Sequence, residues 1–185
     1  MLATIMKNVQ NDIVYSRDVV EFVTVAAEFC AYLEQSEGRP REEFVGTLLK
    51  LLPFLYLKAT LLPKVETDDD CYPEELVSEA DYEWIRATVA SIMEADDEFL
   101  ELSGIGMMQT DETRLQTISE NMADVYQAVR NFVGTYKNGV ESIMREALWT
   151  VVDSFELYWG ERIVDTLRVL HRVRYAANGM DYDDM

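Results

Sequence analysis

Apolar residues recur at the helical period along almost the whole chain, and this pattern restricts the possible folds more than any other feature. No alternation typical of a β-strand persists for more than a few residues. In the last part of the chain one sector of a helical wheel, drawn at about 100° per residue, collects these residues: Met144, Leu148, Val152, Phe155, Trp159, Ile163, Leu170 and Val173. The sequence therefore predicts an all-α protein.

Helix-ending residues divide the pattern into separate helices joined by short connections. Gly38, the acidic segment after Pro63, the glycines near Ser103 and the Asn138-Gly139 pair all interrupt it. The helices are expected at about 12–37, 40–62, from Ser78 to about Leu102, 111–136 and 139–175. Short connections favour antiparallel neighbours, so we expect a bundle of about five long helices.

The length of 185 residues suits a single domain, which we assign to residues 1–185. Its ends should fray over about 1–11 and 177–185.

The second helix carries apolar residues on nearly every side. One stripe contains Phe44, Leu48, Leu51, Leu52, Leu55, Ala59 and Leu62. Phe54, Leu57 and Leu61 line the opposite side. Because a helix that is apolar all round is normally buried, this helix is predicted to be central or well covered.

The chain is strongly acidic, with a formal net charge of −19. This charge repels nucleic-acid phosphates and anionic lipid headgroups, so we expect no direct nucleic-acid partner and no membrane partner. A protein with a basic surface is electrostatically favoured. No signal-peptide pattern is present, and Cys30 and Cys71 follow no pattern, so a reducing, cytoplasmic location is expected.

Several enzyme classes lack the residues that they require. One histidine and two cysteines are too few for a structural zinc site or a di-iron site. The chain has no phosphate-binding loop, dinucleotide fingerprint or nucleophile elbow. We predict no catalytic residue, metal or cofactor, although paired carboxylates leave the question of enzyme activity open.

The stretch FELYWGERIVDTLRVLHRVRY in the last helix holds the remaining candidates. Arg168 and His171 lie near the helix end, where positive charge complements the helix dipole and pairs with neighbouring acids. The alternative interpretation is that these two residues contact an anion or a partner.

The helical wheel of this last helix places Glu156 on its apolar side. Gly160 follows one turn later without a side chain, so a notch is expected beside Glu156 and Trp159. A carboxylate there needs a partner, and Lys58 is the one charge in the apolar part of the second helix. The notch would hold either a buried Glu156–Lys58 pair or a ligand.

Three stretches, FELYWGERIVDTLRVLH, LLPFLYLKATLLP and VVEFVTVAAEFCAYLE, make the chain resemble a bacterial family designated domain of unknown function 5063. The resemblance covers nearly the whole chain. Positions that match the family pattern are Phe155, Glu156, Trp159, Gly160, Asp165, Leu167, Arg168, Leu170 and His171. Some members carry His where this chain has Tyr158, which speaks against a metal here.

The resemblance implies an all-helical cytosolic protein, encoded in some members near nucleic-acid processing genes. It implies no activity.

Two hypotheses of function follow. The first is a non-enzymatic acidic helical module that binds another protein, with a link to nucleic-acid processing and with Trp84, Met107 and Met108 as exposed contact candidates. The alternative is a small-ligand-binding protein or unassigned enzyme with its site at the Glu156/Gly160 notch. A third idea, mimicry of DNA by rows of carboxylates, is weaker. The sequence indicates no oligomeric state.

Overall fold

The computed structural model describes residues 13–66, 73–100 and 115–176, and this part of the chain is an all-α bundle, as predicted. The helices are α2 (Arg17–Glu34), α3 (Arg41–Thr60), α4 (Glu79–Met93), α5 (Ile118–Lys137), α6 (Glu141–Ser154) and α7 (Gly160–Tyr175). A π-helical turn, Phe155–Trp159, joins α6 directly to α7. These two helices therefore make up the single long helix expected at the end of the chain. The predicted frayed ends lie outside the described residues.

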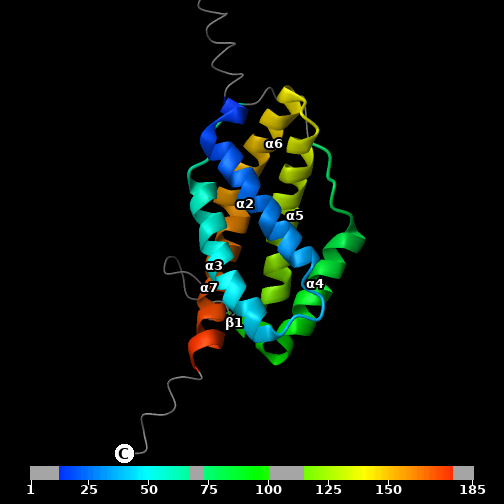
Figure 1. Cartoon of the computed structure of the whole chain (residues 1–185), viewed down its shortest axis with the longest axis vertical. Helices are drawn as coiled ribbons and strands as arrows, with labels where there is room; N and C mark the ends of the chain where they lie inside the picture. The colour runs from blue at the N-terminus through cyan, green and yellow to red at the C-terminus, as the bar shows by residue number, and fades with distance from the viewer. Residues whose placement is uncertain (1–12, 67–72, 101–114, 177–185) are drawn as a thin grey trace, which may run out of the picture.

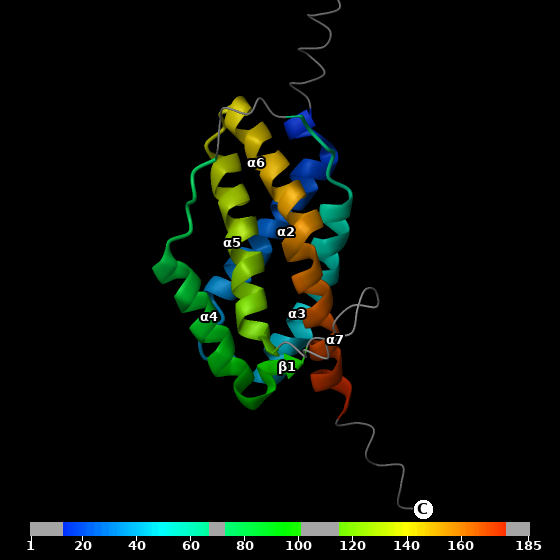
Figure 2. The ribbon, with the colours of Figure 1, turned by 180° about the vertical axis from the view of Figure 1, so that it is seen from behind.

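Helix α5 is the centre of the bundle. It packs against α2, α4, α6 and α7, while α3 packs against both α2 and α7. Figures 1 and 2 show α4 flanking the bundle on the outer side of α5, away from α3 and α7. The last helix thus lies between α3 and α5.

The core forms where the apolar stripes of these helices meet. On α5 the buried residues include Ile118, Met122, Val125, Val129, Phe132 and Val133, as the helical period predicted. Phe22 of α2 packs against Phe132 of α5 and Trp159 of the last helix, with ring centroids 5.4 and 6.4 Å apart. This aromatic group joins three helices at the middle of the bundle.

Helix α3 is covered on one side only, so the expectation of a well-covered helix was wrong. Its first stripe is buried except for the half-buried Leu51. Phe54, Leu57 and Leu61 are 48, 52 and 46% exposed. The reason is that α2 and α7, the main neighbours of α3 among the described elements, leave these three side chains about half uncovered.

Two short strands replace helix that the sequence pattern predicted. Helix α4 ends at Met93, and the next residue, Glu94, has a positive φ of 53°. Strand β1 (Glu98–Leu100) then pairs antiparallel with β2 (Leu115–Thr117). Leu100 and Leu115 are exposed in these strands. Three-residue strands are too short to produce a detectable alternation.

None of the helices within residues 13–66, 73–100 and 115–176 is long and apolar enough to cross a bilayer.

Candidate functional site

The π-turn in the last helix determines where most of the candidate residues lie. Within this turn Trp159 is fully buried, and its indole N–H donates to the carbonyl of Val151 and to Oγ of Ser154, both at 3.1 Å. The Trp159 ring also packs edge-on against the ring of Phe155, with centroids 4.6 Å apart. The Trp-Gly pair is therefore a packing and hydrogen-bonding element of the core.

The space beside Gly160 is filled. Gly160 is buried, and the backbone carbonyl and ring of Phe155 lie where a side chain at position 160 would project. Phe155 in turn contacts Tyr56 of α3, with ring centroids 5.1 Å apart. A notch at Gly160 open to a ligand is therefore not formed.

Glu156 and Lys58 have different partners from those expected. Glu156 is exposed and pairs with Lys64, just beyond α3, at 2.7 Å. Lys58 forms an ion pair with Glu21 of α2, and its side chain is only 16% exposed. The expected Glu156–Lys58 pair is wrong because a π-turn holds more residues than an α-turn, so a 100° wheel misplaces Glu156.

Glu156 does border a small hollow at the end of α3. This hollow measures about 140 Å³ and is lined by Lys64, Val65, Trp149, Val152, Asp153 and Glu156. Its size is below the range of about 300–1,000 Å³ that is usual for small-molecule sites.

The basic residues of α7 lie away from Glu156, toward the C-terminal end of that helix. His171 is exposed, and its ring lies 4.8 Å from the ring of Tyr175. Arg168 is half-buried. Arg174 pairs with Glu42 of α3 at 2.7 Å, as expected for arginines near a helix end beside acidic neighbours. The candidates Glu156, Trp159, Gly160, Lys58, Arg168 and His171 therefore do not converge on one site.

A polar cluster on α5 was missed by the sequence analysis. Asp124 accepts hydrogen bonds from the hydroxyls of Tyr82 at 2.9 Å and Tyr158 at 2.5 Å. Arg162 lies 3.8 Å from the same carboxylate, and its guanidinium stacks 4.7 Å from the centre of the Tyr158 ring. Burial, then the hydrogen bond to Asp124, and then the charge of Asp124 raise the pKa of Tyr82 and of Tyr158. Both phenols therefore stay protonated as donors and connect α4, α5 and the last helix.

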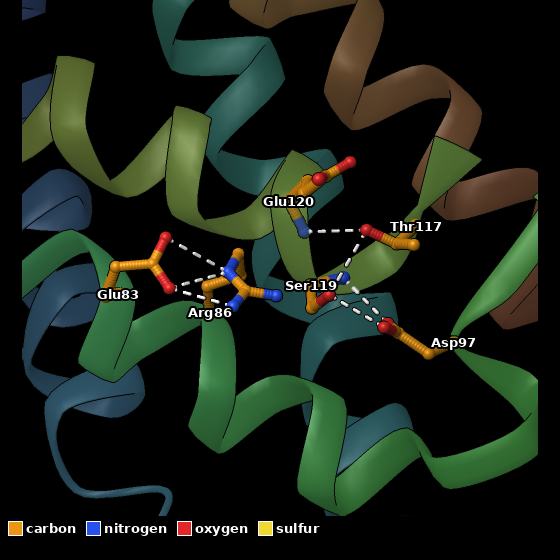
Figure 3. A network of polar contacts seen from close by, with 6 residues as sticks. All are labelled: Glu83, Arg86, Asp97, Thr117, Ser119 and Glu120. Atoms are coloured by element: carbon orange, nitrogen blue, oxygen red, sulfur yellow. Dashed lines mark hydrogen bonds and ion pairs between the residues drawn. The ribbon is translucent and has the colours of Figure 1, made fainter. Parts of the chain in front are cut away.

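A second polar group holds the start of α5, as Figure 3 shows. The Asp97 carboxylate accepts from the backbone N–H of Ser119 at 2.8 Å and from its hydroxyl at 2.7 Å. Thr117 Oγ1 accepts from the N–H of Glu120 at 3.1 Å. These contacts satisfy donors that a helix start leaves without partners, so this group is a helix cap that anchors the strands.

The described residues offer no metal cluster or reactive thiol for chemistry. No group of three or more His, Cys, Asp or Glu side chains among them could hold a metal ion. Cys30 is buried, and burial raises the pKa of its thiol to about 12. A thiol that stays protonated is a poor nucleophile.

Trp84, expected as an exposed contact, is 41% exposed on α4. It borders a hollow of about 550 Å³ together with Glu37, Arg39, Arg41 and Glu94. Met107 and Met108, the other contact candidates, lie outside the described residues.

Comparison with known proteins gives a family and a structural relative. The model of a family described as "Domain of unknown function (DUF5063)" matches residues 13–176. The crystal structure of protein BF1032 from Bacteroides fragilis is similar, with 41% sequence identity and a TM-score of 0.80. That match covers 89% of this chain and 96% of the other. No curated protein matches the chain.

Proposed function

The chain belongs to the DUF5063 family, whose description states no activity, and we propose that it is a non-enzymatic helical module that binds another protein through the outward face of α3. The observation that carries this proposal is the stripe of Phe54, Leu57 and Leu61. These residues are spaced at i, i+3 and i+7, with Leu61 directly after the last residue of α3, and each is about half exposed.

Exposed apolar side chains are common singly, but an ordered stripe of three large ones is typical of a contact surface. The stripe has the shape of one half of a helix-to-helix contact, in which an amphipathic helix of the partner lays its own apolar face alongside. Helix α3 supplies a rigid support, since its opposite face is buried in the core.

The net charge of −19 supports a partner with a basic surface. A field of this sign speeds the approach of a basic protein and opposes a second copy of the same acidic chain. Proteins that process nucleic acids carry basic surfaces, so the proposed link to nucleic-acid processing would run through such a protein.

A photo-crosslinking amino acid at position 57 in the native host tests the proposal. We expect one reproducible crosslinked basic protein, and we expect the complex to weaken as salt is raised. The paired substitutions Leu57→Ser and Leu61→Ser should remove binding to that purified protein while leaving the thermal unfolding temperature unchanged.

Leu157→Ser is the matched control, because Leu157 is a leucine that is 74% exposed outside the stripe. The Leu157→Ser variant should bind the partner protein as tightly as the unmodified chain does. Equal binding by the stripe variant and the control would contradict the proposal. So would a homodimer in sedimentation that the stripe substitutions dissociate, because the partner would then be a second copy.

A further inference from the structure

A second surface, independent of α3, lies between α5 and α6. There a groove of about 400 Å³ separates the two helices, a volume within the usual range for small-molecule sites. Short side chains make up part of its lining: Ala128 and Thr135 on α5, and Ala147, Thr150 and Ser154 on α6, beside the larger Asn131, Phe132, Trp149 and Val151. A larger side chain at one of the short positions would take up part of this volume.

The outer wall of the groove is held in place by specific contacts. Residues 73–75 line it, and Figure 2 shows this segment running beside α5 toward α4. Asn131 Oδ1 accepts from the backbone N–H of Leu76 at 2.8 Å and of Val77 at 2.9 Å. The side chain of Leu76 also packs onto Gly134 of α5, where a Cβ atom would collide with it. These contacts fix Leu76 and Val77, which directly follow residues 73–75, against α5.

The charges at the groove favour a cation. Glu74 and Glu75 line its edge, and none of its lining residues in the described chain is a lysine or arginine. Trp149, which is 41% exposed, presents an aromatic surface at the same groove. Carboxylates and an aromatic face together attract an ammonium or guanidinium group, while the walls suit an apolar body.

We propose that this groove binds a small organic cation, with its charged group at Glu74 and Glu75 and its apolar part between α5 and α6. The inference goes beyond the proposed protein-binding function and uses none of the residues of the α3 stripe. A variant that loses cation binding at the groove should still bind protein through the α3 stripe, and a variant that loses the stripe should still bind the cation.

Phenethylammonium is a suitable probe, with neutral 2-phenylethanol and anionic 3-phenylpropionate as comparisons of similar shape. The N–H signals of the three tryptophan indoles can be followed by NMR during titration. We expect the Trp149 signal to move saturably with phenethylammonium. The affinity for each of the other two probes should be at least about tenfold lower. The Trp84 signal, from a residue that does not line the groove, should stay in place.

Two variants locate the binding. Ala128→Leu fills the groove and should abolish the shift, which separates this groove from the smaller hollow that Trp149 shares with Glu156. If Ala128→Leu does not fold by circular dichroism, Thr150→Leu serves the same purpose from the exposed side. The pair Glu74→Gln and Glu75→Gln should weaken binding about fivefold to tenfold.

The matched control removes two carboxylates elsewhere, by Glu28→Gln and Glu161→Gln, and should leave the affinity unchanged. Absence of a saturable shift, equal binding of all three probes, or binding that survives both filling variants would overturn the proposal.

Discussion

A methyl group on Gly160 would lie 2.6 Å from the carbonyl oxygen of Phe155 and 2.8 Å from its ring. Contacts this short force a backbone or a packed ring to move. We therefore expect Gly160→Ala to destabilise the protein by about 1–3 kcal/mol, the usual cost of overpacking. Urea unfolding followed by circular dichroism measures the change in the free energy of unfolding.

Gly46→Ala is the control for this substitution. Gly46 also lies inside a helix, but nothing approaches its missing side chain within 4 Å. Alanine there should stabilise the protein by up to about 1 kcal/mol, because it is the better helix former. If the two substitutions had the same effect, the contact between Gly160 and Phe155 would not explain the Trp-Gly pair.

The hydrogen bonds to Asp124 should contribute measurably to stability. Tyr82→Phe and Tyr158→Phe each remove one donor from this carboxylate, and we expect each to cost about 1 kcal/mol. Because the two hydroxyls share one acceptor, the double variant should depart from additivity in a double-mutant cycle.

Tyr15→Phe provides the comparison, since among the described residues the hydroxyl of Tyr15 donates to the weak acceptor Sδ of Met144 at 3.9 Å. Its unfolding free energy should change little. An equally large loss in Tyr15→Phe would show that the Asp124 contacts are not special.

The core could be predicted from the sequence, while the positions of the candidate site residues could not. Residues such as Phe22, Leu48 and Val129 are buried because the helical period of 3.6 residues places them on one face. The π-turn does not follow that period, so the helical wheel placed Glu156 on the apolar side although it is exposed. For the same reason the wheel did not predict that Tyr158 bonds to Asp124. The hydrogen bonds of a five-residue turn leave no separate mark in the amino-acid pattern.

The exposed stripe on α3 escaped prediction for a different reason. Phe54 and Leu57 are apolar, and a sequence does not state whether a neighbouring helix covers them. The arrangement of α2 and α7 on the two flanks of α3 decides this point. Phe54 and Leu57, which a helical wheel places on the second apolar side of α3, are therefore exposed in the structure.

The ion pair between Glu21 and Lys58 should make stability depend on pH in the acid range. The hydrogen bonds from Lys58 and Arg17 lower the pKa of Glu21 to about 2, from an ordinary value of 4.5. Since the folded pKa is below the unfolded one, this contribution is complete above pH 4.5. It is lost as the pH falls toward 2.

A carbon NMR titration of the Glu21 carboxyl group measures this pKa directly. Lys58→Met should move the pKa upward toward its ordinary value. Lys64→Met should leave it unchanged, because Lys64 pairs with Glu156 instead. A Glu21 carboxyl that titrates near 4.5 in the unmodified protein would contradict this prediction.

The buried thiol of Cys30 should be chemically inert in the folded protein. Burial raises its pKa to about 12, and the nearby charge of Glu34 adds to the shift. In a Cys71→Ser background we expect Cys30 to react with a disulfide reagent at pH 8 about a thousandfold more slowly than an exposed thiol. An added Ser91→Cys, at an exposed position on α4, supplies the exposed thiol for comparison. If Cys30 reacted without urea as fast as the cysteine introduced by Ser91→Cys, the core would have to open readily. Cys30 would then again be a candidate nucleophile.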